Sequence, residues 1–265
     1  MMRTNNVKKI LFCRCANRDL VTETDRRRMR RWLRRAGAPV LEVPDLCGVL
    51  AADDRRVCDW LRDPGVAVIA CHPRAVRSLT AWKNIDLGSE NALFNLRETP
   101  PDRIAAALGV ETDAEVEPEP APRPSEKPSW EPWFPVIDEQ RCHHCGDCRQ
   151  FCLFDVYERT NDGRVRVTNP TNCKNNCPAC ARICPHVAII FPKHPHPPIN
   201  GAPVEDETHA REAVRVDVSR ALGRDPYEML AARRRTRLLR KKARPRGADN
   251  EHGDGTGSDP SESTE

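Results

Sequence analysis

The sequence predicts three regions of different build. These are an α/β domain with a small parallel sheet, an α+β domain organised around cysteines, and a tail that is first helical and then disordered. Short apolar runs alternate with helical patterns over roughly the first hundred residues, as in a parallel sheet with crossover helices. Eight of the 13 cysteines fall between Cys142 and Cys184. Prolines alternate with charged residues between Val116 and Pro135, which indicates a spacer.

The first strand and helix are predicted near the N-terminus. Residues 9–13 form an apolar run that reads as a strand. Residues 24–36 have a helical pattern, with Thr24 or Asp25 near the cap and Gly37 just past the end.

The alternation of strand and helix then continues along the chain. Residues 40–43 are expected to form a strand, residues 50–61 a helix and residues 66–70 a third strand. The third strand is continuously apolar, which is typical of a buried parallel position. A helix over 73–82 and a strand over 92–96 complete the predicted domain.

Four cysteines of this domain are candidate redox thiols. Cys15 follows the first strand, Cys47 the second and Cys71 the third, while Cys13 points to the same side as Cys15. Ligands of open parallel sheets bind at the carboxyl ends of strands, so these thiols are expected on one rim. They would form a redox-active thiol pair or a third metal centre; the alternative is that they are small buried hydrophobes. Cys58 lies in the middle of a predicted helix and is expected to be plain core.

Two segments of this domain resemble the leading domain of the flavin-containing subunits of heterodisulfide reductases. They are Phe12-Cys13-Arg14-Cys15 and Ile69-Ala70-Cys71-His72-Pro73-Arg74. The chain lacks the glycine-rich dinucleotide fingerprint that such subunits carry elsewhere, so the resemblance does not imply bound flavin.

Composition divides the chain into five segments. A stretch in which prolines alternate with charged residues cannot form a helix interior and serves as an extended spacer. The last residues are small and polar and have no apolar side chains to order them. We expect an α/β domain over 1–112, a Pro/Glu-rich linker over 113–134, a cysteine-rich domain over 135–198, a basic helical extension over 199–246 and a disordered tail over 247–265.

The eight clustered cysteines form two quartets, and Pro185 follows the last of them. Three thiolates on one tight loop reach three irons of one cubane, and the fourth is carried toward the other cubane. The quartets therefore interlock. The first cluster is assigned Cys142, Cys145, Cys148 and Cys184, and the second Cys152, Cys173, Cys177 and Cys180.

Zinc and disulfides are the alternatives for these cysteines. Zinc takes four ligands, usually as two pairs, and has no use for a triplet plus a displaced fourth ligand followed by proline. Disulfide frameworks belong to short secreted chains. The spacing therefore favours two [4Fe-4S] clusters.

Residues 135–192 resemble a bacterial-type ferredoxin domain with two [4Fe-4S] clusters. The resemblance rests on Pro135-Val136-Ile137-Asp138, on the run from Cys142 to Cys152, and on Cys173 through Ile190. The sequence of residues 172–180 resembles that of uncharacterised multidomain bacterial proteins of this class. There are two departures: Leu153 replaces the usual proline, and the step from Cys173 to Cys177 is one residue longer than usual.

The ferredoxin-like domain should be closed by two short hairpins. Residues 136–137 are expected to pair with the apolar run 187–191, and residues 165–167 with 156–157 across an Asn-Asp-Gly turn. Four apolar side chains are expected to pack around the clusters and exclude water: Phe151, Phe154, Ile183 and Val187.

Electron transfer is the function that this cofactor set predicts. All eight thiolates are used as ligands, so neither cubane has an open iron for substrate chemistry. The chain is better described as an electron carrier or redox subunit than as a stand-alone enzyme. The alternative is a component of a thiol- or heterodisulfide-type oxidoreductase that uses the N-terminal cysteines. A nucleic-acid-associated iron–sulfur protein is the third hypothesis.

Two basic segments bear on partners. Seven arginines lie between Arg26 and Arg35, where Met29, Trp32 and Leu33 are left to face the sheet; the arginines read as a solvated helix face. Nine lysines or arginines and no acid lie between Arg233 and Arg246. Such a surface can dock an acidic redox partner or bind phosphates. No aromatic residues interleave with this run, which disfavours nucleic acid.

The remaining composition predicts a cytoplasmic protein. There is no run of eighteen apolar residues, so no membrane span is expected. The first six residues are too polar for a secretory signal, and many unpaired cysteines suit a reducing compartment. The net charge of +4 in 265 residues is mild.

Overall fold

The computed structural model of the chain describes residues 7–112 and 130–222, with side chains up to residue 214. Both domains fall within one compact unit, Met1–Pro226. The first domain consists of β1 (Lys9–Cys13), α1 (Glu23–Leu33), β2 (Val40–Val43), α2 (Leu46–Ala51), α3 (Arg55–Arg62), β3 (Val66–Ala70), α4 (Pro73–Trp82), β4 (Ala92–Asn95) and α5 (Pro101–Ala107).

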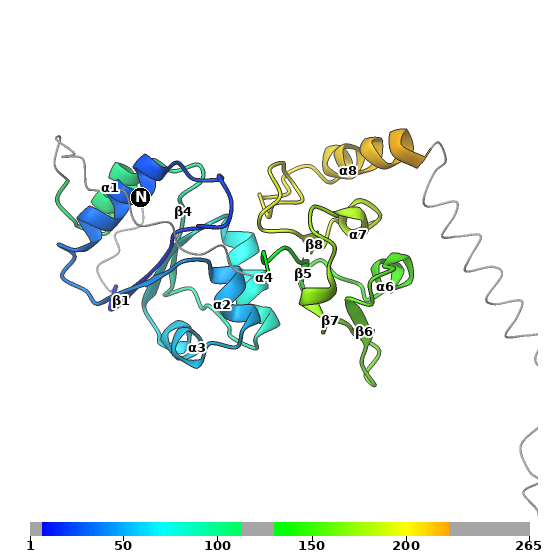
Figure 1. The fold of residues 1–265 in the computed structure, drawn as a ribbon, viewed down its shortest axis with the longest axis horizontal. Coiled ribbons are helices and arrows are strands. Elements are labelled where there is room, and N and C mark those ends of the chain that lie inside the picture. Colours follow the sequence, from blue (N-terminus) through cyan, green and yellow to red (C-terminus); the bar gives the residue numbers. More distant parts are fainter. Residues whose placement is uncertain (1–6, 113–129, 223–265) are drawn as a thin grey trace, which may run out of the picture. The chain divides into compact units, whose positions relative to one another are not determined.

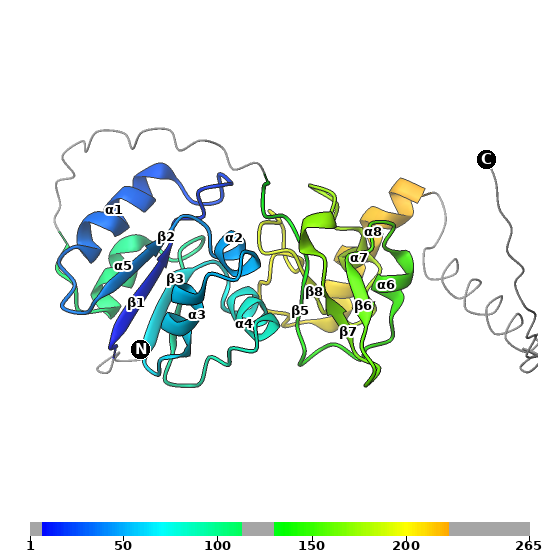
Figure 2. The same ribbon diagram turned by 60° about the horizontal axis from the view of Figure 1, so that its bottom comes forward.

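A four-stranded parallel sheet is the centre of the first domain (Figure 2). Its strand order is β2-β1-β3-β4, so the chain first winds to one side of β1 and then to the other. The strand order therefore reverses between β1 and β3. In open α/β sheets the crevice at the carboxyl ends of two such strands is where ligands bind.

Successive residues of each strand face opposite sides of the sheet, which gives two cores. Leu11 and Cys13 of β1 pack with residues of α2, α3 and α4. Ile10 and Phe12 pack with α1 and α5 on the other face. Figures 1 and 2 show these two helix groups on either side of the sheet. The predicted strands and the parallel α/β class are confirmed.

Three helix predictions need correction. Helix α1 begins after Thr22, whose hydroxyl accepts a hydrogen bond from the Asp25 amide, so the cap is neither Thr24 nor Asp25. The helix expected over 50–61 is two helices, because Asp53 adopts a φ of 54° and Asp54 caps α3. Helix α5 was not anticipated. Met29, Trp32 and Leu33 are buried as expected.

The second domain is built from short elements. They are β5 (Val136–Ile137), α6 (Asp147–Phe151), β6 (Tyr157–Arg159), β7 (Val165–Val167), a 3₁₀ turn (Pro170–Asn172), α7 (Ala179–Arg182), β8 (Ile189–Ile190) and α8 (Glu207–Leu222). Strand β5 pairs antiparallel with β8, and β6 pairs antiparallel with β7. Both predicted strand pairings are therefore confirmed, and the pair β6–β7 is a hairpin.

The end of the expected linker is buried. Trp133 and Phe134 are 3% and 2% exposed, and Phe134 packs on the core beneath α2 and α4. The proline-rich part before residue 130, the basic block at 233–246 and the tail at 247–265 lie outside the described residues. Among the helices that are described, none is both long and apolar enough to cross a membrane.

Candidate metal centres and a thiol rim

The first set of cysteines lines one small cavity. The cysteines of this set lie on the loop before α6, in α6 itself and on the segment after α7. The cavity has a volume of about 20 Å³, and Cys142, Cys145, Cys148 and Cys184 are among its lining residues. Gly146, at a φ of 88°, lets this loop turn sharply; a Cβ there would meet the Arg159 guanidinium.

The second set lines a second cavity. This cavity has a volume of about 100 Å³ and contains Cys152, Cys173, Cys177 and Cys180 in its wall. The fourth cysteine of each run in the sequence thus lines the cavity of the other run. This arrangement fits the interlocked assignment better than two sequential quartets.

The electrostatics group the thiols in the same way. Burial raises the pKa of Cys148 strongly, and Cys184, Cys145 and Cys142 raise it further. Burial raises the pKa of Cys173 to about 12, with Cys177 and Cys152 as the other causes. Thiolates around one cavity repel one another, so the ionised set needs positive charge between them. The irons of a cluster supply it.

Hydrogen bonds from inside the domain reach sulfurs of both cysteine sets. Tyr157 is fully buried, and its hydroxyl donates to the Cys180 sulfur at 3.1 Å. The Ala188 amide donates to the Cys184 sulfur at 3.4 Å. Hydrogen bonds to cluster sulfurs help set the reduction potential. The sequence predicts Tyr157 in a hairpin but gives no signal for this contact.

The extra residue between Cys173 and Cys177 is absorbed by a tight turn. The Cys177 amide donates to the Lys174 carbonyl at 3.1 Å, and Asn176 takes a φ of 61°. Asparagine tolerates this left-handed conformation better than most residues. Arg18 of the first domain donates to the side chains of Asn175 and Asn176. The segment from Cys173 to Cys177 is therefore a tight turn, and hydrogen bonds from Arg18 stabilise it.

Histidines flank the first set. The rings of His143 and His186 stack with their centroids 4.0 Å apart. Burial, followed by the charge of His143, lowers the pKa of His186. The Nδ1 of His144 accepts from the Val165 amide at 3.3 Å and lies 3.6 Å from the Cys142 sulfur. His144 and His186 are thus held in place rather than loose on a loop.

The predicted packing of apolar side chains around the cysteines is found, although not all of these side chains are buried. Ile183 and Val187 are buried, at 0% and 2% exposure, and Phe151 and Phe154 line the cavity of the second set. Phe154 is 37% exposed, and Leu153, which also lines this cavity, is 87% exposed. The second set therefore lies beneath an exposed apolar pair.

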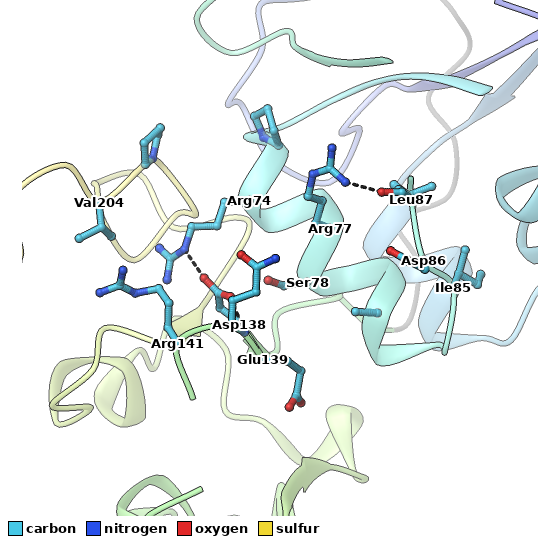
Figure 3. A pocket seen from close by; sticks show the side chains of 14 residues that line it. Arg74, Arg77, Ser78, Ile85, Asp86, Leu87, Asp138, Glu139, Arg141 and Val204 are labelled. Atoms are coloured by element: carbon cyan, nitrogen blue, oxygen red, sulfur yellow. Dashed lines mark hydrogen bonds and ion pairs between the residues drawn. The ribbon is translucent and has the colours of Figure 1, made fainter. Parts of the chain in front are cut away.

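The two domains are joined by an ion pair beside a larger pocket (Figure 3). Arg74 of α4 donates to Asp138 at 2.6 Å and also to the Val187 carbonyl. The pocket next to this pair has a volume of about 500 Å³. Its other arginines, Arg77 and Arg141, donate to the Leu87 carbonyl and to Glu207 respectively. Each cation that lines it therefore already has a partner.

The four N-terminal thiols lie together, as their strand-end positions predict. Cys13 and Cys47 are both 7% exposed and belong to one core cluster, and Cys15 and Cys71 pack against it. The Leu46 amide donates to the Cys13 sulfur at 3.1 Å. Cys58, which is buried in α3, belongs to the same core cluster. We call Cys13, Cys15, Cys47 and Cys71 the thiol rim.

The thiol rim lies at the point where the strand order reverses. Cys15 and Cys71 follow β1 and β3, the two strands on either side of that point. Burial, then the Asp45 carboxylate, raises the pKa of Cys15 to about 11. Burial, then Cys15, raises the pKa of Cys71 to about 12. Cys15 has a φ of 50°, a strained conformation for a non-glycine residue.

A buried ion pair accompanies the thiol rim. Lys193, from the segment that follows β8, lies 2.5 Å from Asp45, which caps α2. Their side chains are 3% and 5% exposed. The sequence gives no signal for Lys193, because one lysine among prolines and histidines looks like a surface residue.

Within the described ranges, no three His, Cys, Asp or Glu side chains are arranged around a single metal ion. The sulfurs of each cluster set surround a cavity instead. In a cubane each thiolate binds a different iron, so a cavity lined by four sulfurs is the arrangement that such a cluster requires.

Comparisons with known proteins agree with this geometry. Residues 134–185 match the family model described as a 4Fe-4S dicluster domain. An uncharacterized ferredoxin of Methanocaldococcus jannaschii is 46% identical over 61 residues, which are 23% of this chain and 41% of that protein. The chain thus spans less than half of the length of this relative.

The chain therefore contains a ferredoxin-type iron–sulfur domain. Domains of this class carry two [4Fe-4S] clusters, and their function is electron transfer between redox partners. The match does not extend to the α/β domain or to the residues after 185.

Proposed function

We propose that the chain passes electrons between a donor and an acceptor through two [4Fe-4S] clusters with interlocked ligands. Cys142, Cys145, Cys148 and Cys184 hold the first cluster. Cys152, Cys173, Cys177 and Cys180 hold the second. The observation that carries the assignment is that each of these sets lines its own cavity.

Iron content and EPR of substituted chains test the ligand assignment. The anaerobically reconstituted parent should hold about eight irons, four in each cubane. Cys145→Ala should leave about four and abolish one of two reduced-cluster signals. The double variant Cys145→Ala/Cys184→Ala should also leave about four, since both residues serve the first cluster. Cys145→Ala/Cys152→Ala should leave almost none.

The controls separate ligand loss from general damage. Cys58→Ala removes a buried cysteine outside both sets and should keep about eight irons. If Cys145→Ala/Cys152→Ala kept four irons and Cys145→Ala/Cys184→Ala lost all eight, the quartets would be sequential. A parent chain without iron after anaerobic reconstitution would refute the proposal altogether.

A second candidate function concerns the thiol rim. We propose that two of its cysteines form a dithiol/disulfide couple that exchanges electrons with the clusters, as in a thiol-type oxidoreductase. The specific support is a continuous series of contacts from Cys15 of the first domain to the second cysteine set. The Arg18 amide donates to the Cys15 carbonyl at 3.4 Å, and the Arg18 side chain donates to Asn175 and Asn176 in the turn before Cys177.

Aromatic contacts continue this link. The Arg18 guanidinium lies 4.8 Å from the centre of a Trp133 ring, and the Trp133 indole donates to the Cys177 carbonyl at 3.5 Å. Cys173 packs against the core cluster that contains Cys13. The second set is thus the one in contact with the thiol-rim side of the first domain.

Mass spectrometry of the full chain tests this second function. After mild oxidation with diamide, peptides that contain thiol-rim cysteines should show a disulfide that dithionite reduces in the presence of the clusters. The dithionite step should fail in Cys145→Ala/Cys152→Ala, which lacks clusters. Thiols that stay reduced under diamide would refute the couple and leave the cluster proposal intact. Iron near twelve per chain would instead indicate a third cluster.

A further inference from the structure

The second domain contributes a side chain to the carboxyl end of the parallel sheet, the end at which the crevice between β1 and β3 lies in open sheets of this kind. Lys193 lies against Asp45 there, and its charge lowers the pKa of both Cys15 and Cys47. In most open α/β sheets this crevice receives a ligand from solution. Here a lysine from the ferredoxin-type domain occupies the position beside the thiols.

The position of Lys193 is fixed by Arg97, which follows β4. The Arg97 guanidinium donates to the carbonyls of Pro192 and His194 at 3.2 Å each, on either side of Lys193. A turn in which the His194 amide donates to the Phe191 carbonyl at 2.8 Å holds the segment from the other direction. The ammonium is therefore placed by both domains.

A buried ion pair is weak evidence for stability alone. The cost of removing two charges from water offsets most of their attraction, and apolar residues of similar volume often serve as well. Apart from Asp45, the Lys193 ammonium has no hydrogen-bond partner among the described residues. Burial lowers the pKa of Lys193, but the charges of Cys47 and Asp45 outweigh burial, so the pKa is raised.

The charges around the thiol rim oppose one another. Asp45 disfavours the ionisation of Cys15 and Cys47, while Lys193 favours it. Arg26 and Arg97 add smaller favourable effects on Cys15. Without Lys193, a buried carboxylate would face four thiols with little to offset it. Thiol–disulfide exchange proceeds through the thiolate, so this balance controls its rate.

We propose that Lys193 is the positioning residue of the thiol rim: its ammonium offsets Asp45 and stabilises the thiolate that Cys15 or Cys47 must form during dithiol/disulfide exchange. The proposal rests on the second candidate function. Oxidation of the pair breaks two S–H bonds, forms one S–S bond and releases two protons to water. The two electrons would be accepted by the two [4Fe-4S] clusters that the two cysteine sets would hold, one by each.

Alkylation kinetics of the full chain test this role. The reduced protein is treated with iodoacetamide at several pH values, and mass spectrometry of peptides follows each cysteine separately. Lys193→Met should slow the alkylation of Cys15 and Cys47 at least tenfold at a given pH. It should also shift the pH dependence of their alkylation toward higher pH. Lys193→Arg should stay within about threefold of the parent, because the charge is retained.

Three comparisons make the result specific. A junction loosened by Lys193→Met would expose the thiols and speed alkylation, so a slower reaction does not arise from partial unfolding. Asp45→Asn/Lys193→Met should react faster than Lys193→Met, since the unopposed carboxylate is gone. Asp53→Asn/Lys83→Met removes the same charges from an ion pair at the surface and should match the parent.

Parent-like alkylation in Lys193→Met would overturn the proposal. A diamide-treated parent with no disulfide in the thiol rim would instead refute the redox couple. The two failures are therefore distinguishable, because the first concerns the rate of thiolate formation and the second the existence of the disulfide.

Discussion

At the residue scale, the hydrogen bond from Tyr157 to Cys180 offers a direct test of how the protein tunes the second cluster. Tyr157→Phe keeps the ring and removes only the donor to the sulfur, which lies 3.1 Å from the hydroxyl. The hydrogen bond is stronger to the more negative, reduced cluster. Its loss should therefore lower that cluster's midpoint potential by about 60 mV, if the bond is stronger by about 1.4 kcal/mol in the reduced state than in the oxidised state.

An EPR-monitored redox titration measures this shift. The signal of the first cluster serves as an internal control, because Tyr157 donates to a sulfur of the second set. Equal shifts of both signals would contradict the assignment of Cys180 to a cluster separate from that of Cys145, and the absence of any shift would contradict the effect of Tyr157 on the potential.

Residues of the candidate sites differ in how far the sequence predicted them. The eight clustered cysteines and the four thiol-rim cysteines were identifiable because their spacing and strand-end positions have local meaning. Tyr157, Arg18 and Lys193 were not, since each acts on a group at least 20 residues away in the chain, by contacts made only on folding.

At the element scale, the start of α1 provides a matched pair of substitutions. Thr22 caps the helix with a side-chain acceptor 3.1 Å from the Asp25 amide, whereas Thr24 lies exposed inside the first turn. Thr22→Ala should lower the free energy of unfolding by about 1 kcal/mol, or roughly 2–4 °C in Tm. Thr24→Ala should change it little.

Thermal melts followed by far-UV circular dichroism make this comparison under identical cluster loading. A larger loss from Thr24→Ala than from Thr22→Ala would contradict the cap described above. The prediction of the cap was wrong because Thr22, Thr24 and Asp25 are all acceptable cap residues. Only the path of the backbone selects one of them.

The split between α2 and α3 has a similar explanation. The apolar pattern of Leu50, Val57, Cys58 and Leu61 continues across the break, because both helices face the same core. Asp53 takes a left-handed conformation, and Asp54 starts a new helix by accepting from the Val57 amide at 3.2 Å. Periodicity reports which face is buried, and not whether the helix is continuous.

At the scale of the whole molecule, the Arg74–Asp138 pair should matter for the junction between the domains. The two side chains are 14% and 10% exposed, and burial lowers the pKa of Arg74. Arg74→Met leaves Asp138 unpaired in a mostly buried position and should cost roughly 3 kcal/mol. Limited proteolysis of the loaded protein should then cleave the chain between the domains faster.

Arg77→Met is the matched control, because Arg77 lies on the same helix and, among the described residues, its side chain donates to the Leu87 carbonyl alone (Figure 3). It should cost about 1 kcal/mol. Arg74→Met/Asp138→Asn should recover part of the loss, since no charge is left without a partner. Equal proteolysis of the Arg74 and Arg77 variants would show that the ion pair does not hold the junction.

The sequence by itself determined the parallel α/β class, both hairpins of the second domain and the presence of a ferredoxin-type iron–sulfur domain. Those features follow from periodicity and ligand spacing, which are local properties of the chain. Tertiary structure alone decided which segments surround the thiols. Strand order brings Cys15 and Cys71 to one crevice, and the second domain delivers Lys193 to it. Contacts between distant segments depend on the complete packing of the chain, and no local pattern encodes them.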